Sequence, residues 1–193
     1  MRSIEAIKEI FKDLSDGVRI VLLIHRSKEG GFNNTHKRHL KKIITNNSQE
    51  FFETILEFQE FIKQDGRPLR IYSSLNNRDF GKAIRMYKHL QIERDYDSEE
   101  LRNKFYLNTK NNFIGCLMNN NCKISKNFLF DLDECDDRSF HSIYNILEKL
   151  TEIIVYYPTK NGYHIITKPF NYKALDDNIV SILHKDSLML IDY

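Results

Sequence analysis

Apolar and polar residues along this chain follow two periods, one typical of strands and one typical of helices. Residues 18–24, VRIVLLI, are a β-branched apolar run of strand length, and residues 69–75, LRIYSSL, alternate as a strand does. A polar, basic, glycine-containing segment follows the first run. A helix is predicted over residues 48–63, and a second helix is predicted to begin near Phe80, behind the capping segment NNRD.

The same alternation continues through the second half of the chain. A helix is expected from near Ser98 to roughly Met118, followed by a polar turn and the strand NFLFDLD. The apolar positions within residues 140–150 mark another amphipathic helix. Three strands follow, EIIVYY, GYHIIT and SLMLID, with a short helix expected over residues 172–183 before the last. The complete pattern predicts a mixed α/β domain.

Length and composition fit one globular domain, since the chain has 193 residues, of which 41% are hydrophobic and 29% charged. We expect a helical N-terminal lobe of about residues 1–120 and a motif-bearing sheet of about residues 121–193. The formal net charge is only +2, so any contact with nucleic acid must come from a local basic face. Residues 1–17 are expected to form a charged amphipathic helix rather than a signal peptide, and no apolar run reaches membrane-spanning length. These features predict a cytoplasmic protein without membrane contact.

The three cysteines, Cys116, Cys122 and Cys135, are an odd number, which argues against a disulfide framework. Together with His141 they form the spacing C-x5-C-x12-C-x5-H. The short intervals are wider than those usual between the ligands of a zinc site. Buried or incidental thiols are therefore the default interpretation, with a zinc site as the alternative.

Two carboxylates lie one residue apart in the strand FLFDLDE. Because side chains alternate along a strand, Asp131 and Asp133 are predicted to point to the same face, with their Cα atoms roughly 6.5 Å apart. Their mutual repulsion has to be offset by a divalent metal, by a basic residue or by full hydration. Asp136 and Asp137 are expected to cap the helix that follows.

The segment PTKNGYHIITKPF predicts a tight turn at Asn161 and Gly162 between two strands of a hairpin. The turn carries Lys160, the second strand carries His164, and Lys168 lies beyond that strand. Backbone N–H groups and cations arranged in this way could bind an anion such as a triphosphate. The alternative is a purely structural histidine beside an ordinary turn.

Two further groups of basic residues could follow a nucleic-acid backbone or bind a triphosphate. Arg70 and Arg78 flank the strand around Tyr72, an aromatic residue that could stack on a base or pack in the core. Arg78 could form one helix stripe with Lys82 and Arg85. The second group consists of His36, Lys37, Arg38, Lys41 and Lys42. The alternative for both groups is a solvated charged face.

The order of these pieces resembles the archaeo-eukaryotic primase superfamily, the primase-polymerases. The three motifs of that family match Asp131 and Asp133, the segment KNGYH that ends at His164, and the final strand LMLIDY with Asp192. This resemblance covers roughly residues 127–193. Over most of its length the chain is also similar to small uncharacterised phage proteins with an N-R-D segment, a D-x-D strand and the motif T-K-N-G-Y-H-x-I-T-x-P-F.

The resemblance to the primase-polymerases implies an RRM-like mixed sheet that carries the catalytic residues Asp131, Asp133, Asp192 and His164. The three aspartates would hold two divalent metals, Mg²⁺ or Mn²⁺, which suit carboxylate and phosphate oxygens. His164 would contact the phosphates of the incoming nucleotide. The implied activity is nucleotidyl transfer in DNA replication, from nucleoside triphosphates and on a single-stranded DNA or RNA template, in the host cytoplasm if the protein is phage-encoded.

The expected nucleotide contacts combine the turn with nearby cations. They are Lys160, Asn161, Gly162, His164, Arg78 and Lys168. Two other functions stay open. The protein could bind nucleotides or single-stranded nucleic acid without catalysis, or it could be a metal-dependent nuclease, because the same carboxylates could support cleavage of a phosphodiester. Asp131 and Asp133 could also be no more than a hydrated strand end.

Overall fold

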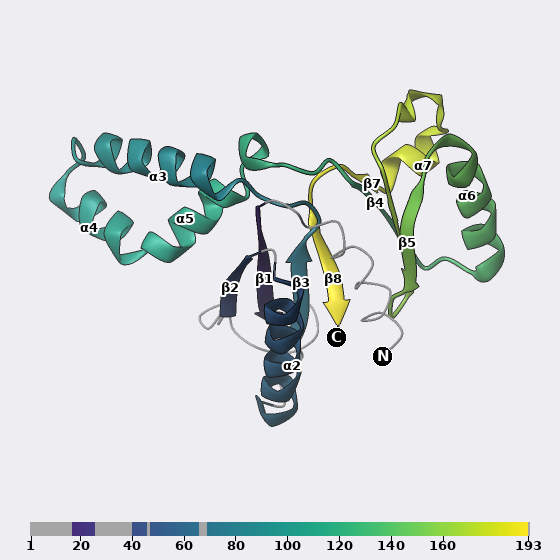
Figure 1. Cartoon of the computed structure of the whole chain (residues 1–193), viewed down its shortest axis with the longest axis horizontal. Helices are drawn as coiled ribbons and strands as arrows, with labels where there is room; N and C mark the ends of the chain where they lie inside the picture. Colours follow the sequence, from purple (N-terminus) through teal and green to yellow (C-terminus); the bar gives the residue numbers. More distant parts are fainter. Residues whose placement is uncertain (1–16, 26–39, 46, 66–68, 193) are drawn as a thin grey trace.

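The computed structural model describes residues 17–25, 40–45, 47–65 and 69–192, without the side chains of residues 25, 40–45, 48 and 192. Within these ranges the protein is a mixed α/β structure built around two four-stranded sheets (Figure 1). Every pairing between the described strands is antiparallel, whereas a mixed sheet was expected.

The first sheet has the strand order β2-β1-β3-β8. Its strands are β1 (Val18–His25), β2 (Leu40–Thr45), β3 (Leu69–Ser74) and β8 (Leu188–Asp192). Three of these strands come from the first part of the chain, and the fourth comes from the far end. The N-terminal lobe was expected to be mainly helical. Its strands β1 and β3 were predicted at residues 18–24 and 69–75, whereas β2 was not.

The second sheet has the strand order β5-β6-β4-β7. Its strands are β4 (Phe128–Asp133), β5 (Ile153–Pro158), β6 (Gly162–Thr167) and β7 (Leu183–His184). Strands β5 and β6 form the predicted hairpin, and β4 and β6 occupy the centre of the sheet. The strand SLMLID was assigned to this sheet by its position in the sequence, but it belongs to the first one as β8.

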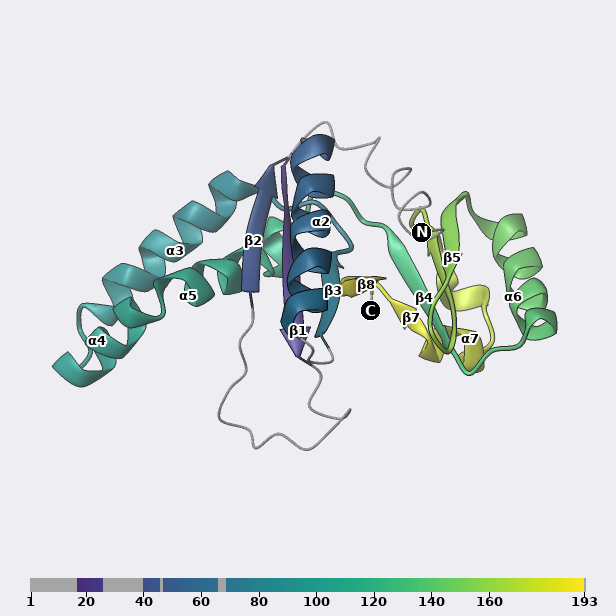
Figure 2. The same ribbon diagram turned by 90° about the horizontal axis from the view of Figure 1, so that it is seen from below.

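Helices cover both faces of the first sheet. Helix α2 (Ser48–Asp65) packs on one face through Phe51, Ile55 and Phe58. Helices α3 (Phe80–Arg94) and α5 (Thr109–Leu117) contribute to the apolar cluster on the other face. With α4 (Glu99–Leu107) they form an arm that projects away from the second sheet (Figure 2).

The helix predicted from Ser98 to Met118 is two helices, because the chain leaves helical geometry at Asn108. The φ and ψ angles of Asn108 are −103° and 19°, and its side-chain amide donates to the carbonyl of Lys104 at 2.9 Å. Asparagine side chains compete for backbone groups in this way, which makes them poor residues for a helix interior. The local break divides the segment that returns along α3 into the two helices α4 and α5.

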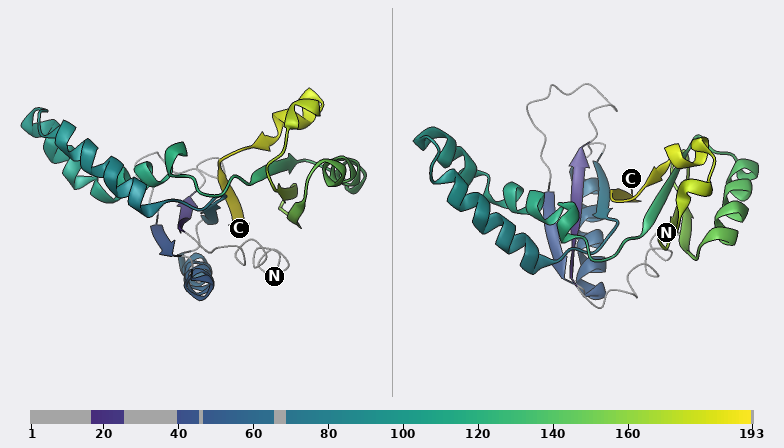
Figure 3. Two further views of the ribbon diagram at one scale, coloured as in Figure 1. Left: turned by 45° about the horizontal axis from the view of Figure 1, so that its top comes forward. Right: turned by 90° about the horizontal axis from the view of Figure 1, so that it is seen from above.

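The second sheet is covered on its outer face by α6 (Asp137–Leu150) and α7 (Asp177–Ser181), at the opposite end of the molecule from the arm (Figure 3). Phe140 and Leu147 of α6 pack in one cluster with Phe130 of β4. The short helix predicted over residues 172–183 is instead a 3₁₀ turn η3 (Tyr172–Ala174), α7 and the short strand β7. A second 3₁₀ turn, η2 (Asn120–Cys122), precedes β4.

Several expectations concern the first part of the chain. Strand β2 lies inside the segment that looked merely polar and basic, so the backbone of Lys41 and Lys42 belongs to a strand. The predicted helix over residues 1–17, apart from Gly17, and the basic residues 36–38 lie outside the described residues. No helix within the described part has the length and apolar character needed to cross a membrane.

Candidate functional site

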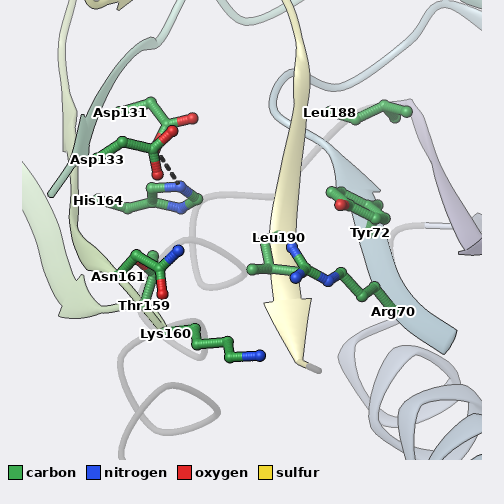
Figure 4. Close-up of a pocket in the computed structure, with 10 residues that line it drawn as sticks. All are labelled: Arg70, Tyr72, Asp131, Asp133, Thr159, Lys160, Asn161, His164, Leu188 and Leu190. Carbon is green, nitrogen blue, oxygen red and sulfur yellow. Dashed lines mark hydrogen bonds and ion pairs between the residues drawn. The ribbon is translucent and has the colours of Figure 1, made fainter. Parts of the chain in front are cut away.

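A pocket lies between the two sheets, at the place where β3 and β8 face β4 and β6 (Figure 4). The second sheet and its hairpin turn supply one wall. This wall consists of Asp131, Asp133, Thr159, Lys160, Asn161 and His164. The other wall consists of Arg70, Tyr72, Leu188 and Leu190 from the first sheet. Seven residues that the sequence marked as candidates therefore lie together, although they come from three separate segments: Arg70 and Tyr72, Asp131 and Asp133, and Lys160, Asn161 and His164.

Strand alternation explains how β4 presents its carboxylates to the pocket. Phe130 and Leu132 point to the outer face of the sheet, where they pack in the cluster formed with α6. Asp131 and Asp133 consequently share the inner face, as predicted. The side chain of Asp131 is 35% exposed and Asp133 is exposed. Both carboxylates can therefore be reached by an ion or a ligand from the pocket.

His164 lies directly opposite Asp131 in the register of β4 and β6. Its Nε2 is 3.1 Å from Oδ1 of Asp131, and its Nδ1 is 3.0 Å from the hydroxyl of Tyr157. The residue is only 4% exposed, so both ring nitrogen atoms are oriented by protein groups. The sequence analysis predicted that His164 would lie near the carboxylates if the two strands were neighbours. Strands β4 and β6 are indeed paired.

Tyr157 is the buried neighbour that sequence reasoning missed. It lies opposite His164 in the β5–β6 hairpin, and its hydroxyl donates to the carbonyl of Leu190 at 2.9 Å. Burial raises the pKa of this hydroxyl, and the charge of Asp131 adds to the increase, so Tyr157 stays protonated. The hairpin predicted at Asn161 and Gly162 could have identified Tyr157, because pairing the two strands of that hairpin puts this tyrosine across from His164.

The hairpin turn is clamped against the end of β4. The backbone N–H of Glu134 donates to the carbonyl of Asn161 at 2.7 Å, and the N–H of Thr159 donates to the carbonyl of Gly162 at 2.8 Å. A Cβ atom on Gly162 would lie 1.8 Å from the carbonyl oxygen of Leu132, so only glycine fits there. This close approach holds Lys160 and Asn161 beside the carboxylates.

The wall formed by the first sheet adds an arginine and a tyrosine. Arg70 and Tyr72 alternate on β3 with the buried Ile71, and both line the pocket. Figure 4 shows the side chains of Arg70 and Lys160 extending from opposite walls into the space between them. Carboxylates and cations thus occupy different parts of the same pocket.

Two of the expected nucleotide contacts lie away from the pocket. Arg78 is completely buried and forms a bidentate ion pair with Asp186, with Nη1 2.9 Å from Oδ2. Lys168 follows the far end of β6 from Gly162, and its N–H donates to the carbonyl of Glu152 at 3.0 Å. The structure therefore gives Arg78 a structural partner and does not bring Lys168 to the candidate site.

The backbone of Asp192 lies near the pocket, but its side chain is not among those described. Its backbone pairs with Ile71 at the end of β8, two residues after Leu190, which lines the pocket. Its side chain lies outside the described part of the chain. The strand that carries Asp192 is therefore next to the pocket, although it belongs to a different sheet from Asp131 and Asp133.

The donor atoms at the site suit a hard divalent cation better than zinc. Among the described side chains, no three His, Cys, Asp or Glu residues gather closely enough to enclose a metal ion. Mg²⁺ is commonly held by only one or two carboxylates, with water and substrate phosphates completing its shell. The accessible carboxylates of Asp131 and Asp133 fit that mode of binding.

The three cysteines and His141 do not gather into a metal-holding group within the described residues. Cys116 and Cys122 pack in the cluster beneath α3, and burial raises the pKa of both thiols. Cys135 packs beside the other cluster, near α6. The described structure therefore favours the default interpretation of incidental thiols, since these residues and His141 do not form a metal-holding group.

Comparisons of the chain with protein-family models, with curated proteins and with solved structures found no match. The resemblance to the primase-polymerases consequently stays a prediction. The function has to be argued from the geometry and chemistry of the pocket itself.

Proposed function

We propose that this protein is a metal-dependent nucleotidyltransferase of the primase-polymerase kind, which joins nucleoside triphosphates on a single-stranded DNA or RNA template. One observation carries the proposal: two strand carboxylates, a histidine and a lysine-bearing turn line a single pocket. These residues supply both of the charges that nucleotidyl transfer needs, acidic oxygen atoms for a metal and cations for a triphosphate.

Asp131 and Asp133 would hold Mg²⁺ or Mn²⁺ through their oxygen atoms. The ion supplies charge stabilisation for the attacking hydroxyl and the leaving pyrophosphate. Asp192 is the additional carboxylate we propose for this role, because β8 brings its backbone to the edge of the same pocket. A metal ion at this site would explain why Asp131 and Asp133 can lie on the same face, because its positive charge would offset the repulsion between the two carboxylates.

The basic residues would bind and orient the triphosphate. Lys160 from the turn and Arg70 from β3 extend into the pocket from opposite walls, and together they can neutralise phosphate oxygens. His164 Nε2 points to the pocket beside Asp131, where it can contact a phosphate bound to the same ion. The side-chain amide of Asn161 adds hydrogen-bonding capacity at the turn.

The second sheet supports an RRM-like fold for the catalytic unit. The order of its elements is β4-α6-β5-β6-α7-β7, which is the order of a split β-α-β unit, β-α-β-β-α-β. Asp131 and His164 lie on its two central strands, and the helices cover only the opposite face. The other face packs in part against the first sheet and in part lines the pocket, so functional side chains on its central strands can reach a bound nucleotide.

The proposed activity can be tested with a primed and an unprimed single-stranded template, nucleoside triphosphates or deoxynucleoside triphosphates, and Mn²⁺ or Mg²⁺. A denaturing gel should show products longer than the primer, or new oligonucleotides on the unprimed template. The matched control is the variant Asp131→Asn/Asp133→Asn, which should form neither.

Other outcomes of this assay would replace the proposal. Fragments of the supplied template or primer, seen when these strands carry the label, would indicate the nuclease. Thermal stabilisation by nucleotides without any product would indicate a non-catalytic binding protein. Failure to bind metal, nucleotides and single-stranded nucleic acid alike would leave Asp131 and Asp133 as a hydrated strand end.

A further inference from the structure

A single buried hydroxyl connects the strands that line the pocket. Tyr157 of β5 is 2% exposed, and its hydroxyl oxygen is 3.0 Å from Nδ1 of His164 on β6. The same hydroxyl is 2.9 Å from the carbonyl oxygen of Leu190 on β8. Because Nε2 of His164 also lies 3.1 Å from Oδ1 of Asp131 on β4, a series of polar contacts crosses from the second sheet to the first.

The Leu190 carbonyl lies at an irregularity in the first sheet. Leu190 pairs with Tyr72 and Asp192 pairs with Ile71, so Ile191 is an extra residue in β8. An extra residue of this kind is a β-bulge, which bends a strand and redirects the side chains that follow it. The Tyr157 hydroxyl therefore binds β8 at the bend that immediately precedes Asp192.

The number of protons available shows which group donates and which accepts in each of these contacts. The Tyr157 hydroxyl has one proton, and donating it to the Leu190 carbonyl leaves the phenol oxygen as an acceptor. Nδ1 of His164 must then be the donor to Tyr157. With Nδ1–H held in this way, the ring is oriented so that Nε2 faces Asp131 and the pocket, and Nε2 needs a proton of its own to donate to the Asp131 carboxylate.

We infer that Tyr157 is a positioning residue, whose hydroxyl fixes both the orientation of His164 and the bend of β8 before Asp192. The inference rests on the proposed function, because the role given to Tyr157 is to position the strands that carry Asp131, His164 and Asp192. Packing alone does not require the hydroxyl. Phenylalanine would keep the edge-to-face ring contact with His164, whereas a buried hydroxyl is unfavourable unless it forms hydrogen bonds.

The test is the variant Tyr157→Phe, which removes the hydroxyl and keeps the ring. Tyr156→Phe is the matched control, because Tyr156 is the neighbouring residue on β5, is 49% exposed and packs against Phe140 and Tyr144. The first readout is the ¹⁵N chemical shifts of the His164 ring at neutral pH without metal. Nδ1 should carry a proton in the wild type and in Tyr156→Phe, and should lose this preference in Tyr157→Phe.

Two results of this NMR measurement would overturn the inference. One is an unprotonated Nδ1 in the wild type, which needs no variant and so is independent of whether Tyr157→Phe folds. The other is an identical set of His164 shifts in the wild type and in Tyr157→Phe. Neither result depends on nucleotidyl transfer.

The second readout is primer extension under saturating metal and nucleotide. Misplacement of a catalytic group by about 1 Å can cost about a hundredfold in rate, so Tyr157→Phe should lower turnover by about tenfold or more. Metal affinity should change much less, since Asp131 and Asp133 remain. If wild type extends no primer, the proposed function fails while the NMR result still decides the role of Tyr157. If wild type is active and both Tyr variants match it, the inference alone fails.

Discussion

At the scale of single residues, the candidate site depends on side chains that alternate along β4 and β6. The alternation that buries Phe130 and Leu132 under α6 also delivers Asp131 and Asp133 to the pocket. A hydrophobic pattern therefore positions the carboxylates, although it contains no information about what they bind. Direct measurement of metal binding is the natural test.

Replacing both Asp131 and Asp133 by asparagine should abolish binding of Mg²⁺ or Mn²⁺, measured by calorimetry. The folded structure should persist, because neither carboxylate is completely buried. Without metal, the variant should be at least as stable as the wild type, since two like charges are removed. Metal affinity equal to that of the wild type would exclude the carboxylates as ligands, and a large loss of stability would indicate a structural ion pair.

Gly162 tests whether the close approach of the turn to β4 is required. Gly162→Ala places a Cβ atom 1.8 Å from the carbonyl oxygen of Leu132, a backbone atom that can move only with its strand. We expect the variant to lose about 3 kcal/mol or more of unfolding free energy, measured by urea denaturation. Gly115→Ala is the matched control, because a Cβ there meets nothing within 4 Å and alanine favours the α5 helix. Equal stabilities of the two variants would contradict the clamp.

At the scale of elements, capping residues define where the helices begin. Asp79 accepts from the N–H of Lys82 at the start of α3, and Asp136 accepts from the N–H of Ser139 at the start of α6. Both caps were predicted from the sequence, in the segments NNRD and DECDD. Helix α6 covers the outer face of the second sheet, so its cap also supports the strand that carries Asp131.

The cap of α6 should make its stability pH-dependent. The hydrogen bonds with Ser139 lower the pKa of Asp136 below the ordinary value of 3.8. The ionised carboxylate therefore stabilises the fold above pH 3.8, and this contribution is lost as the pH falls through the folded-state pKa. Asp136→Ala should lower the melting temperature at pH 7, and its difference from the wild type should shrink in acid.

Asp176 provides the control for the capping prediction. It occupies the N-cap position of α7 but makes no side-chain cap hydrogen bond, so Asp176→Ala should melt close to the wild type at pH 7. A difference between Asp136→Ala and the wild type that stays constant from pH 7 to acid would show that the charge of Asp136 does not contribute.

At the scale of the whole molecule, the two sheets are connected by buried polar contacts as well as by apolar packing. Leu129 and Ile166 of the second sheet share a core cluster with Met189 and Ile191 of the first. Near this cluster, the side chain of Asn76 contacts the backbone of Asn127, which leads into β4. The segment after β3 therefore contacts the connection that leads into β4 and, through the carbonyl of Lys185, the connection between β7 and β8.

Replacing Arg78 gives the strongest test of this connection between the sheets. It forms backbone bridges with Val18 and Lys123, and its guanidinium is paired with Asp186 between β7 and β8. Arg78→Gln should lower the unfolding free energy by about 3 kcal/mol or more, because it leaves a largely buried carboxylate without its cation. The exposed Arg85→Gln on α3 should change stability by about 0.5 kcal/mol or less. Weaker nucleotide binding in Arg78→Gln at unchanged stability would restore Arg78 to the site.

The sequence by itself determined the local structure around the site. Strand and helix periods, the shared face of Asp131 and Asp133, the β5–β6 hairpin and the caps at Asp79 and Asp136 all depend on residues close together in the chain. Such features follow from backbone geometry and short-range hydrogen bonds. The strand β2 escaped notice because its lysines interrupt the apolar pattern.

Only the tertiary structure decided which strands become neighbours. Strand β8 pairs with β3, which brings Arg70 and Tyr72 to the pocket and separates Asp192 from the sheet of Asp131. The burial of Arg78 and the bond from Tyr157 to Leu190 likewise depend on contacts between distant segments. Pairing of distant strands is selected by the combined packing of all layers, and periodicity within one segment does not encode its partner.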